Sequence, residues 1–449
     1  MAASCVRARG SDVDRPGECR LNTPTTAEEQ SLAQIARRVL PGGNFGNMAG
    51  EIVIRSGRGG RVWDVSGNAY IDYLLGSGPM LVGHAHPAVN AAVLEQVERG
   101  STFFVNHEPG IRLAAEIVDA LPCAEQVRFV STGTEADAYA MRLARAHRRR
   151  PKILKFEGGY HGMSDWALMS LWSARENNTG RAVADTAGIP AGLLDEMLVC
   201  PFNDLAAARE MIHTHHDAIA GVIVEPMQRL IPPAPGFLQG LRDLTAAYGI
   251  VLIFDEVVTG FRLAYGGGQT YYGVTPDLCT LGKVIGGGYP LAAIAGRAEI
   301  MAHFDREQVG PESFTPQIGT LSGNPIAAAA GLATLAILKQ PGAYERLFAT
   351  GRAIWAGVEA ALRDAGHAIT MVGEPPMFDA LFTTAPVTDH QGMAGADAAR
   401  ARRLNGLLRA GGILKGEGKI YVSLAHDARD VADTLGAYRA AAARLDAAV

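Results

Sequence analysis

Cysteine, long apolar runs and a strong net charge are all scarce in this sequence. Its 449 residues include five widely spaced cysteines and no CxxC pair, which argues against a disulfide framework or a zinc site and fits a reducing compartment. No apolar stretch reaches the roughly 18 residues of a membrane helix, and the N-terminus has no signal-peptide core. The formal net charge of -5 gives no electrostatic reason to expect nucleic acid or an anionic membrane as a partner. We therefore expect a cytoplasmic protein that acts on small molecules and holds no metal.

Two common nucleotide-binding signatures are also absent. No G-x-G-x-x-G follows a first strand, which disfavours an NAD-dependent enzyme. An acidic pair, Asp255-Glu256, is typical of magnesium sites, but no Walker-type loop precedes it, so a nucleoside-triphosphate enzyme is also disfavoured. What the sequence does have is 48% hydrophobic and 19% charged residues, as in soluble globular proteins, and enough length for two domains.

Helical stretches alternate with short apolar strands between about residues 87 and 335. This order predicts an α/β fold with a mainly parallel sheet, and the continuous apolar strands indicate that helices cover both of its faces. The clearest predicted strands are Gln126–Val130, Ile153–Phe156, Gly221–Val224, Ile250–Phe254 and Leu278–Leu281.

We divide the chain into an N-terminal segment (1–75), a large domain (76–335) and a smaller α+β domain (336–449). The N-terminal segment is predicted to have a loose tail, a helix starting near Thr26, and strands at 52–54, 62–64 and 70–73. In the C-terminal domain we expect helices near 343–364, 396–410 and 428–446 and strands near 368–373, 378–383 and 419–424. The stretch 170–196 has weak periodicity and predicts a long loop, which makes it a candidate lid.

Each of the five predicted strands is followed at once by a cluster of small or polar residues. In open α/β sheets, ligands bind beyond the carboxyl ends of the strands. Five such clusters at one edge of one sheet therefore predict a composite site. In chain order they are Ser131-Thr132-Gly133-Thr134-Glu135, Glu157-Gly158-Gly159-Tyr160-His161-Gly162, Glu225-Pro226, Asp255-Glu256 and Gly282-Lys283.

Three of these residues have two interpretations when each is taken alone. Thr132 precedes a predicted helix, whose first backbone amides favour an anion such as phosphate, but a plain N-cap by Ser131 or Thr132 explains it equally well. Tyr160 follows two glycines and either presents its ring to a planar ligand or is an ordinary rim tyrosine. His161 alone is more typical of a structural histidine than of a catalyst.

An acid and a lysine at neighbouring strand ends point to one specific chemistry. Asp255 ends an apolar strand, and a buried carboxylate needs a cation or several donors because an unpaired buried charge is costly. Lys283 lies among glycines and apolar residues, which lower the pKa of an amine and favour Schiff-base chemistry, unless it is simply a surface lysine. Together they are the two parts that a pyridoxal phosphate (PLP) enzyme needs: a partner for the pyridine nitrogen and an amine for the aldehyde.

The motifs resemble those of class III aminotransferases, a PLP-dependent family of fold type I, and look most like the glutamate-1-semialdehyde 2,1-aminomutase branch and its β-amino-acid transaminase relatives. The resemblance covers about residues 41 to 427. It implies a mainly parallel, mixed seven-stranded sheet flanked by helices, PLP as cofactor, and a homodimer. The stretches that carry it are STGTEA (131–136), FEGGYHG (156–162), VEP (224–226), FDEVVTGFR (254–262), PDLCTLGKVIGGG (276–288) and GTLSGNP (319–325).

The resemblance also implies a role for each matching residue. Lys283 would carry the cofactor as a Schiff base, Asp255 would pair with the pyridine nitrogen, and Tyr160 would stack on the ring. The phosphate would be held by Thr132, Gly133 and Thr134, and Thr320 would reach the phosphate of the neighbouring subunit. The remaining residues expected around the cofactor are His161, Glu225 and Val257 or Val258. Arg262 is expected to be a structural ion-pair residue rather than a substrate ligand.

The substrate side departs from the aminomutase pattern. Aminomutases carry an arginine after their Pro-Gly-Gly turn, where this chain has Gly46 and its neighbours, and their tryptophan corresponds to Ser77. The replacement cation would have to be Arg55, Arg175 or Arg229, which the sequence alone cannot place. The candidate substrate residues are thus Ser77, Trp172, Arg175 and Arg229, two of them on the loop at 170–196.

These departures rank the functional interpretations. The leading one is amino-group transfer from an amine or amino acid, β-amino acids included, to a keto acid or aldehyde by a ping-pong route. The alternative is an intramolecular 2,1-aminomutase, against which the changed pocket counts. A PLP racemase or decarboxylase is weaker, and a non-catalytic PLP-binding protein is weaker still because Lys283, Asp255 and Tyr160 are all kept.

Overall fold

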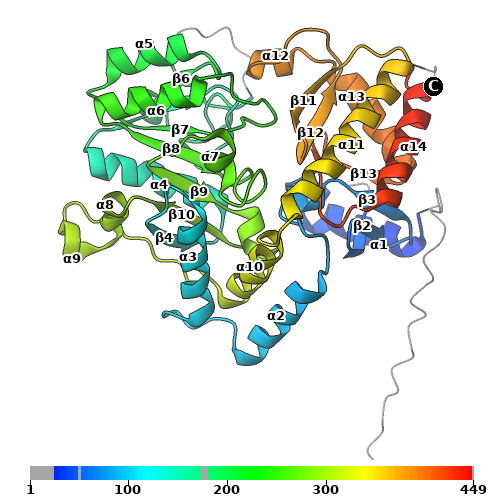
Figure 1. Ribbon diagram of the computed structural model, residues 1–449, viewed down its shortest axis with the longest axis horizontal. Coiled ribbons are helices and arrows are strands. Elements are labelled where there is room, and N and C mark those ends of the chain that lie inside the picture. Colours follow the sequence, from blue (N-terminus) through cyan, green and yellow to red (C-terminus); the bar gives the residue numbers. More distant parts are fainter. Residues whose placement is uncertain (1–24, 49–51, 173–179, 447–449) are drawn as a thin grey trace, which may run out of the picture.

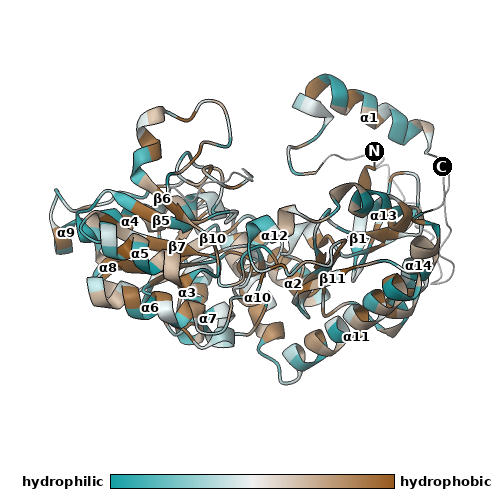
Figure 2. Cartoon of the chain, turned by 90° about the horizontal axis from the view of Figure 1, so that it is seen from above, coloured by the Kyte–Doolittle hydropathy of each residue, from teal (hydrophilic) through white to brown (hydrophobic). Residues whose placement is uncertain are grey.

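The computed structural model describes residues 25–48, 52–172 and 180–446, which form two lobes (Figure 1). One lobe is built on a seven-stranded sheet. The other lobe holds two smaller sheets, in which strands from the start of the chain lie beside strands from its end (Figure 1). Helix α1 (Ala27–Val39) stands away from both lobes (Figure 2).

The large sheet has the strand order β4-β10-β9-β8-β7-β5-β6. All neighbouring strands are parallel except β10, which is antiparallel to both β4 and β9. The predicted mixed, mainly parallel seven-stranded sheet is therefore confirmed. Its strands are β4 (Gln126–Val130), β5 (Lys152–Phe156), β6 (Met197–Cys200), β7 (Ile219–Val224), β8 (Val251–Glu256), β9 (Leu278–Leu281) and β10 (Ala292–Gly296).

All five individually predicted strands are present, but β6 and β10 were not singled out from the sequence. β6 has only four residues, and β10 reads AAIAG, in which alanine and glycine disfavour strands. β10 is a strand because it pairs with β4 on one side and β9 on the other. These partners are distant in the sequence, so the local residues do not predict the pairing. Strand β8 also runs further than predicted, so Asp255 and Glu256 are its last two residues.

Helices cover both faces of the large sheet, which explains the continuous apolar strands. Along β7, Val222 and Val224 belong to one hydrophobic core and Ile223 belongs to the other. Helix α4 (Gly133–Arg148) packs on the face of Ile223. The opposite face is covered by α3 (Glu108–Ala120) and α6 (Phe237–Tyr248), and α10 (Pro325–Leu338) packs on α3 and on α2 (Pro87–Arg99).

The smaller sheets join the two ends of the chain. Strands β1 (Ile54–Arg58), β2 (Arg61–Asp64) and β3 (Ala69–Asp72) are antiparallel, and β13 (Ile413–Leu414) adds to β3 in parallel. The third sheet consists of β11 (Thr370–Glu374), β12 (Met377–Leu381) and β14 (Ile420–Tyr421). The helices predicted near the C-terminus are α11 (Ala343–Asp364), α13 (Ala398–Ala410) and α14 (Ala428–Arg444). The division of the chain at residues 75 and 335 stays a prediction.

One predicted strand is misplaced. We expected a strand at 52–54, whereas β1 covers 54–58 because Ser56, Gly57 and Arg58 pair with the residues of β2. The short connection at Gly59-Gly60 sets this register, so turn geometry outweighs the apolar character of Ile52 and Val53. The predicted helix near Thr26 is present as α1, with the Thr26 side chain accepting a hydrogen bond from the Glu29 amide.

The remaining elements are short. They are the 3-10 turns at Pro41–Gly43, Leu75–Ser77, Ala191–Glu196, Lys283–Gly286 and Ala302–Phe304, and helices α5 (Leu205–His215), α7 (Gly267–Tyr272), α8 (Ala298–Met301), α9 (Arg306–Val309) and α12 (His390–Ala394). Across the described ranges, no single helix is long and apolar enough to cross a membrane. Helices α10 and α11 together would be long and apolar enough, but the pair is bent by 79°. Residues 173–179 of the candidate lid lie outside the described residues, and the lid stays a prediction.

Candidate active site

The carboxyl ends of β5, β7, β8 and β9 bring most of the predicted site residues together. The Tyr160 amide after β5 donates a 3.0 Å hydrogen bond to Glu225 Oε2 after β7. His161 Nδ1 lies 2.8 Å from Asp255 Oδ2 at the end of β8. The charges of Asp255 and Glu225 also act on Lys283, which follows β9. The four strand ends thus form one cluster, as the sheet order requires.

Asp255 is buried and held from several sides. Its Oδ1 accepts a 3.1 Å hydrogen bond from the Val257 amide, while its Oδ2 faces His161. The other ring nitrogen of His161, Nε2, is buried and has no partner among the described residues. Glu256 points to the opposite face of the strand, where the Thr259 hydroxyl and the Gln269 amide donate to it, which explains the second acid of the pair.

A second buried carboxyl group, Asp137 on α4, lies beneath Asp255. The Thr280 hydroxyl donates a 2.6 Å hydrogen bond to Asp137 Oδ1 and lies 3.5 Å from Asp255 Oδ1. Burial raises the pKa of Asp137 well above its ordinary value, and the charge of Asp255 raises it further. The buried site therefore favours the protonated form of Asp137. Sequence reasoning missed Asp137, whose only signal is an acidic residue on the apolar face of a helix.

Lys283 is almost completely enclosed, and its backbone is strained. Burial lowers the pKa of its amine, while Asp255 and Glu225 act in the opposite direction. A Cβ added to Gly78 would lie 3.4 Å from Lys283 Cδ and 3.1 Å from Tyr421 Cε1, so only glycine leaves room there. Lys283 has a φ of 48°, and Ser77 (67°) and Arg229 (62°) share this left-handed conformation. Such strained residues are typical of functional sites.

The start of helix α4 combines both interpretations of its sequence. Thr132 is the N-cap, and Glu135 Oε2 accepts hydrogen bonds of 2.9 Å from the Ser131 and Thr132 amides. The amides of Gly133 and Thr134 stay without a partner in the part of the chain that the structure describes, and they can bind an anion. The capping interpretation therefore accounts for the Thr132 side chain.

A narrow space next to this helix start depends on two glycines and a valine. A Cβ added to Gly133 or to Gly282 would lie 3.1 Å from Val257 Cγ1. Val258 packs instead against the hydrophobic core. Of the two candidates for the residue near the cofactor ring, Val257 is thus the one in the cluster.

The candidate substrate residues are distributed unevenly. The Arg229 guanidinium carbon lies 5.4 Å from the centroid of the Tyr160 ring. Ser77 hydrogen-bonds Tyr421, whose ring packs near Lys283. Trp172 is 60% exposed, and its amide donates to Asp185. Arg175 lies outside the described residues.

A lysine that sequence reasoning missed, Lys419, also belongs to the cluster. Its Nζ lies 5.9 Å from the centroid of the Tyr421 ring. Burial lowers the pKa of Lys419 well below its ordinary value, and the cations Arg229 and Lys283 lower it further. The available signal was weak, because Lys419 lies in the polar turn Gly416–Lys419 outside any recognised motif.

Arg262 is structural, but its partners differ from the prediction. We expected an ion pair, whereas the fully buried guanidinium donates to the backbone carbonyls of Gly78, Pro376 and Val422. It also lies 4.9 Å from the centroid of the Tyr421 ring. Burial lowers its pKa to about 10. Carbonyls from the turn at residue 78 and from the third sheet replace a carboxylate, so Arg262 ties the two lobes together at the site.

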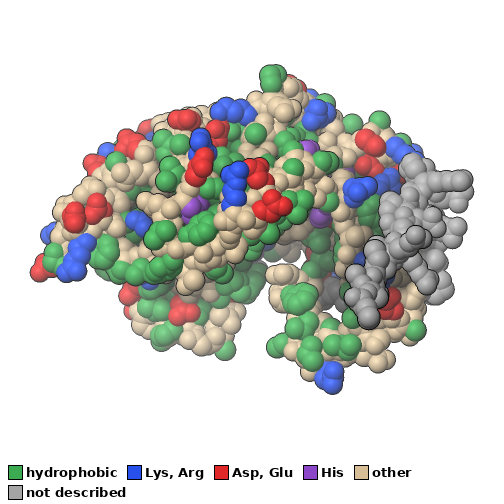
Figure 3. All heavy atoms as spheres, turned by 90° about the horizontal axis from the view of Figure 1, so that it is seen from below, with side chains coloured by type: hydrophobic (Ala, Val, Ile, Leu, Met, Phe, Trp, Pro, Cys, Tyr) green, Lys and Arg blue, Asp and Glu red, His purple; other side chains and the backbone are tan. Residues whose placement is uncertain are grey.

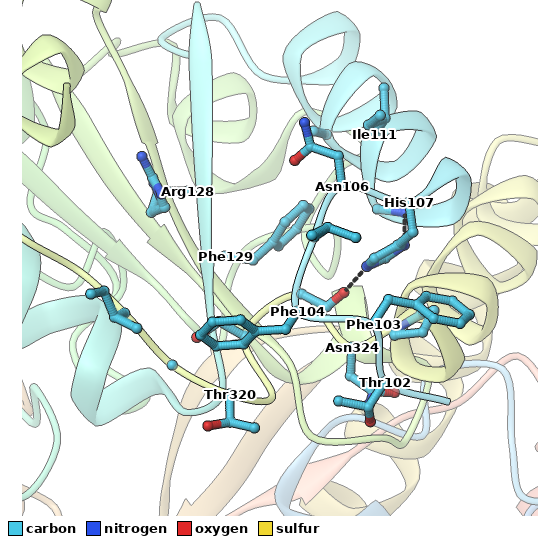
Figure 4. A pocket seen from close by; sticks show the side chains of 18 of the residues that line it. Thr102, Phe103, Phe104, Asn106, His107, Ile111, Arg128, Phe129, Thr320 and Asn324 are labelled. Carbon is cyan, nitrogen blue, oxygen red and sulfur yellow. Dashed lines mark hydrogen bonds between the residues drawn. The ribbon is translucent and has the colours of Figure 1, made fainter. Parts of the chain in front are cut away.

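Thr320 lies apart from the Lys283 cluster, in a separate pocket of about 510 Å³. Figure 4 shows Thr320 lining this pocket together with Phe103, Phe104 and Asn106. The pocket is rich in exposed apolar side chains: Phe104 is 68% exposed and Ile318 is 80% exposed. Within one chain, Thr320 is therefore not brought to the other predicted phosphate residues.

Comparisons with known proteins give matches over most of the chain. The family model described as aminotransferase class-III matches residues 45–391. A glutamate-1-semialdehyde 2,1-aminomutase from Desulforudis audaxviator is 45% identical over 387 residues, which are 84% of this chain and 88% of that protein. The crystal structure of an omega-transaminase from Sphaerobacter thermophilus superposes with a TM-score of 0.88 at 37% identity, covering 93% of this chain and 97% of that chain. A transaminase structure with PLP bound has a TM-score of 0.85 at 31% identity, covering 94% and 99%.

Proposed function

Because the chain belongs to the class III aminotransferase family, we propose that it is a PLP-dependent aminomutase that moves an amino group between neighbouring carbons of one substrate of the glutamate 1-semialdehyde type. The predicted family, fold type and enzyme class are confirmed by the family match and by the solved relatives. PLP is the cofactor of this enzyme, in agreement with the prediction.

The observation that carries the proposal is the 45% identity to an aminomutase over most of both chains. The sequence alone ranked transfer between two molecules first. The curated relative supports the intramolecular alternative better, so we adopt it here.

The residues of the Lys283 cluster fit PLP. Lys283 Nζ would hold the aldehyde carbon, and Asp255 would face the pyridine nitrogen. The free amides of Gly133 and Thr134 would bind the phosphate. His161 Nε2, buried without a partner in the described chain, is a polar atom that a bound group can satisfy. Tyr160 and Val257 would pack on the two faces of the ring.

When bound, PLP supplies an aldehyde that takes up the amino group and a ring that accepts electrons. The chain's own residues hold and move protons. Lys283 Nζ has a lowered pKa, so it is more readily uncharged and able to take a proton from the substrate carbon. Asp137, whose pKa burial raises, favours its protonated form and would add little competing charge beside Asp255. His161 orients Asp255 through the 2.8 Å contact.

A second candidate function is transfer of the amino group between two different molecules. It is favoured by the omega-transaminase structure, which matches this chain at a TM-score of 0.88. The changed pocket also favours it, because Ser77 and Gly46 stand where the aminomutase pattern has tryptophan and arginine.

We include a homodimer in the proposal. Helix α1 exposes Leu32, Ile35 and Val39 along one side, and the Thr320 pocket exposes Phe104 and Ile318. Figure 3 shows hydrophobic side chains on both sides of the hollow between α1 and the sheet lobe. Apolar surface of this extent is typical of an interface, and a second subunit would bring Thr320 toward the phosphate. Sedimentation of the purified protein at twice the chain mass tests this part.

The test of the main proposal is isomerisation without a second substrate. The PLP-loaded enzyme is given glutamate 1-semialdehyde alone, and the products are separated by mass spectrometry-coupled chromatography. The proposal expects the isomer with the amino group on the terminal carbon, and none from the Lys283→Ala enzyme. Product that appears only after a keto acid or a second amine is added would establish the two-molecule transfer instead.

A further inference from the structure

We infer that Arg229 and Lys419 together bind the carboxylate of the substrate, and so replace the arginine that this chain lacks near Gly46. The inference rests on the proposed amino-group chemistry at Lys283, because it places the carboxylate beside that site. It assigns two basic side chains from different lobes to one anion, and it excludes Arg55, the other described arginine that the sequence left open.

Arg229 is presented by a rigid turn. The backbone amides of Gln228 and Ile231 bond each other's carbonyls at 3.0 and 2.8 Å, which closes a two-residue turn with Arg229 at its tip. The other residues of the turn are buried, and the Gln228 side chain donates to the Glu157 carbonyl. The φ of 62° at Arg229 costs free energy that a glycine would avoid, so the side chain is kept there against the backbone preference.

Lys419 approaches from the opposite lobe. It closes the turn Gly416–Lys419 that leads into β14, and its neighbour Tyr421 packs near Lys283 Cδ. The positive charge of Arg229 acts on Lys419, on Lys283 and on Tyr160, which places Arg229 among all three. Two basic side chains thus lie near Lys283.

Neither cation has a carboxylate partner within 4 Å among the residues that the structure describes. Glu225 acts on Lys419 electrostatically, but its own oxygens accept from the backbone amides of Tyr160 at 3.0 Å and Arg229 at 3.5 Å. The lysine just before this turn, Lys415, is buried and paired with Asp379 at 2.7 Å. Arg229 and Lys419 are half-buried, and with no carboxylate within 4 Å in the described chain their donors are available to an anion that comes from outside the chain.

Arg55, the other described arginine that the sequence offered as a replacement cation, is not available to a substrate carboxylate. Arg55 is on β1, is half exposed and bonds Glu28 at 2.5 Å. Arg262 is enclosed by carbonyls. Arg229 offers a planar fork that matches a carboxylate, and a bound carboxylate would favour the protonated form of the Lys419 amine. We therefore expect a substrate with one carboxylate and not a neutral amine.

The test measures carboxylate binding directly. Holoenzyme is titrated calorimetrically with butanoate, an unreactive monocarboxylate, and with butanamide, its neutral isostere. We expect saturable binding of butanoate and at least tenfold weaker binding of butanamide. Arg229→Gln and Lys419→Gln should each raise the Kd for butanoate by about 10- to 100-fold, as for loss of one charge-assisted hydrogen bond.

Two variants keep this test decisive. Arg229→Lys retains the charge and should recover part of the affinity, which shows that Arg229→Gln has not simply misfolded. Arg55→Gln removes an exposed arginine and should leave the Kd unchanged. Equal Kd values in the wild type, Arg229→Gln and Lys419→Gln enzymes, or no preference for butanoate over butanamide, would overturn the inference.

The binding readout is independent of turnover. If butanoate binding depends on both cations but glutamate 1-semialdehyde is not isomerised, the inference stands and the proposed function fails. If isomerisation occurs and the two substitutions leave the Kd and the KM unchanged, the function stands and the inference fails.

Discussion

The two sides of the candidate site are held in different ways. On the strand-end side, Asp255, His161 and Glu225 are buried and fixed by hydrogen bonds to one another's neighbours and to the main chain. On the facing side, Arg229 and Lys419 come from turns and have no carboxylate partner among the described residues. The sheet therefore fixes the proposed cofactor side, and turns carry the proposed substrate side, as is usual for loops on a rigid scaffold.

The largest effect should come from removing the centre of the strand-end side. Lys283→Ala should lower the rate of amino-group transfer by about 10³-fold or more, because the chain loses both the amine and the proton carrier. Steady-state assays with Lys339→Ala as control measure this. Lys339 is exposed and bonded to Glu116, so its loss should leave the rate within about twofold. A Lys283→Ala enzyme with near wild-type activity would place the chemistry elsewhere.

The next effect concerns the link between the two sides. Arg262→Met leaves the carbonyls of Gly78, Pro376 and Val422 without their buried donor, and should lower the free energy of unfolding by about 2–5 kcal/mol. Urea denaturation measures it. Arg297→Met is the control: this half-exposed residue pairs with Asp277 and Glu299, and its loss should cost about 1 kcal/mol or less. Similar losses in both variants would contradict a clamp at Arg262.

A smaller effect is expected on the pH dependence of the free energy of unfolding, to which Asp137 contributes. Its folded-state pKa is raised by burial above the ordinary value of 3.8, so the folded state binds more protons than the unfolded state. Its contribution to stability is present below about pH 4 and is lost as the pH rises toward the folded-state pKa. Asp137→Asn keeps the oxygen that accepts from Thr280 and removes this loss, so unfolding should depend less on pH above 4.

A control with the opposite sign is available. The pKa of exposed Asp305 is lowered by hydrogen bonds from Gln308 and the Glu307 amide, so its contribution is lost as the pH falls. Asp305→Asn should therefore change the acid side of the stability curve only. Identical pH profiles for wild type and Asp137→Asn would show that Asp137 is not a neutral acid in the folded protein.

The smallest effect is expected on the periphery of the substrate side. Trp172 is 60% exposed, and its amide donates a 3.1 Å hydrogen bond to Asp185 Oδ1. Trp172→Ala should change kcat/KM by no more than about twofold, as for an ordinary surface substitution, or about 0.5 kcal/mol. A loss greater than tenfold, measured with saturating and limiting substrate, would move Trp172 into the site and support a closing lid.

The clustering of polar residues at the strand ends could be predicted because its signals are local. Lys283 stands before a run of glycines, and Asp255 ends a continuous apolar strand, so chemistry and position could be inferred from a few neighbours. Asp137 was missed because its importance comes from Thr280 and Asp255, which are distant in the sequence. The Thr132 side chain is explained by capping. The sequence could not decide this, because the Glu135 side chain turns back to the Thr132 amide only in the folded structure.

The substrate side was less accessible for a physical reason. Arg229 lies in a turn and has a left-handed backbone conformation. No residue of Gln228–Ile231 is a glycine or an asparagine, so the sequence does not predict that conformation. Lys419 comes near the site only because Tyr421 of β14 packs beside Gly78, close to Lys283. Strand β10 was missed for a similar reason, because its pairing partners and not its alanines make it a strand.

The most direct measurement identifies the residue that carries the cofactor. The protein is loaded with PLP and reduced with borohydride, which fixes the cofactor to its lysine, and peptides are mapped by mass spectrometry. The account predicts one modified residue, Lys283, with Lys155 and Lys419 unmodified. A cofactor mass on another lysine, or no covalent cofactor at all, would contradict the assignment of the strand-end side as the PLP site.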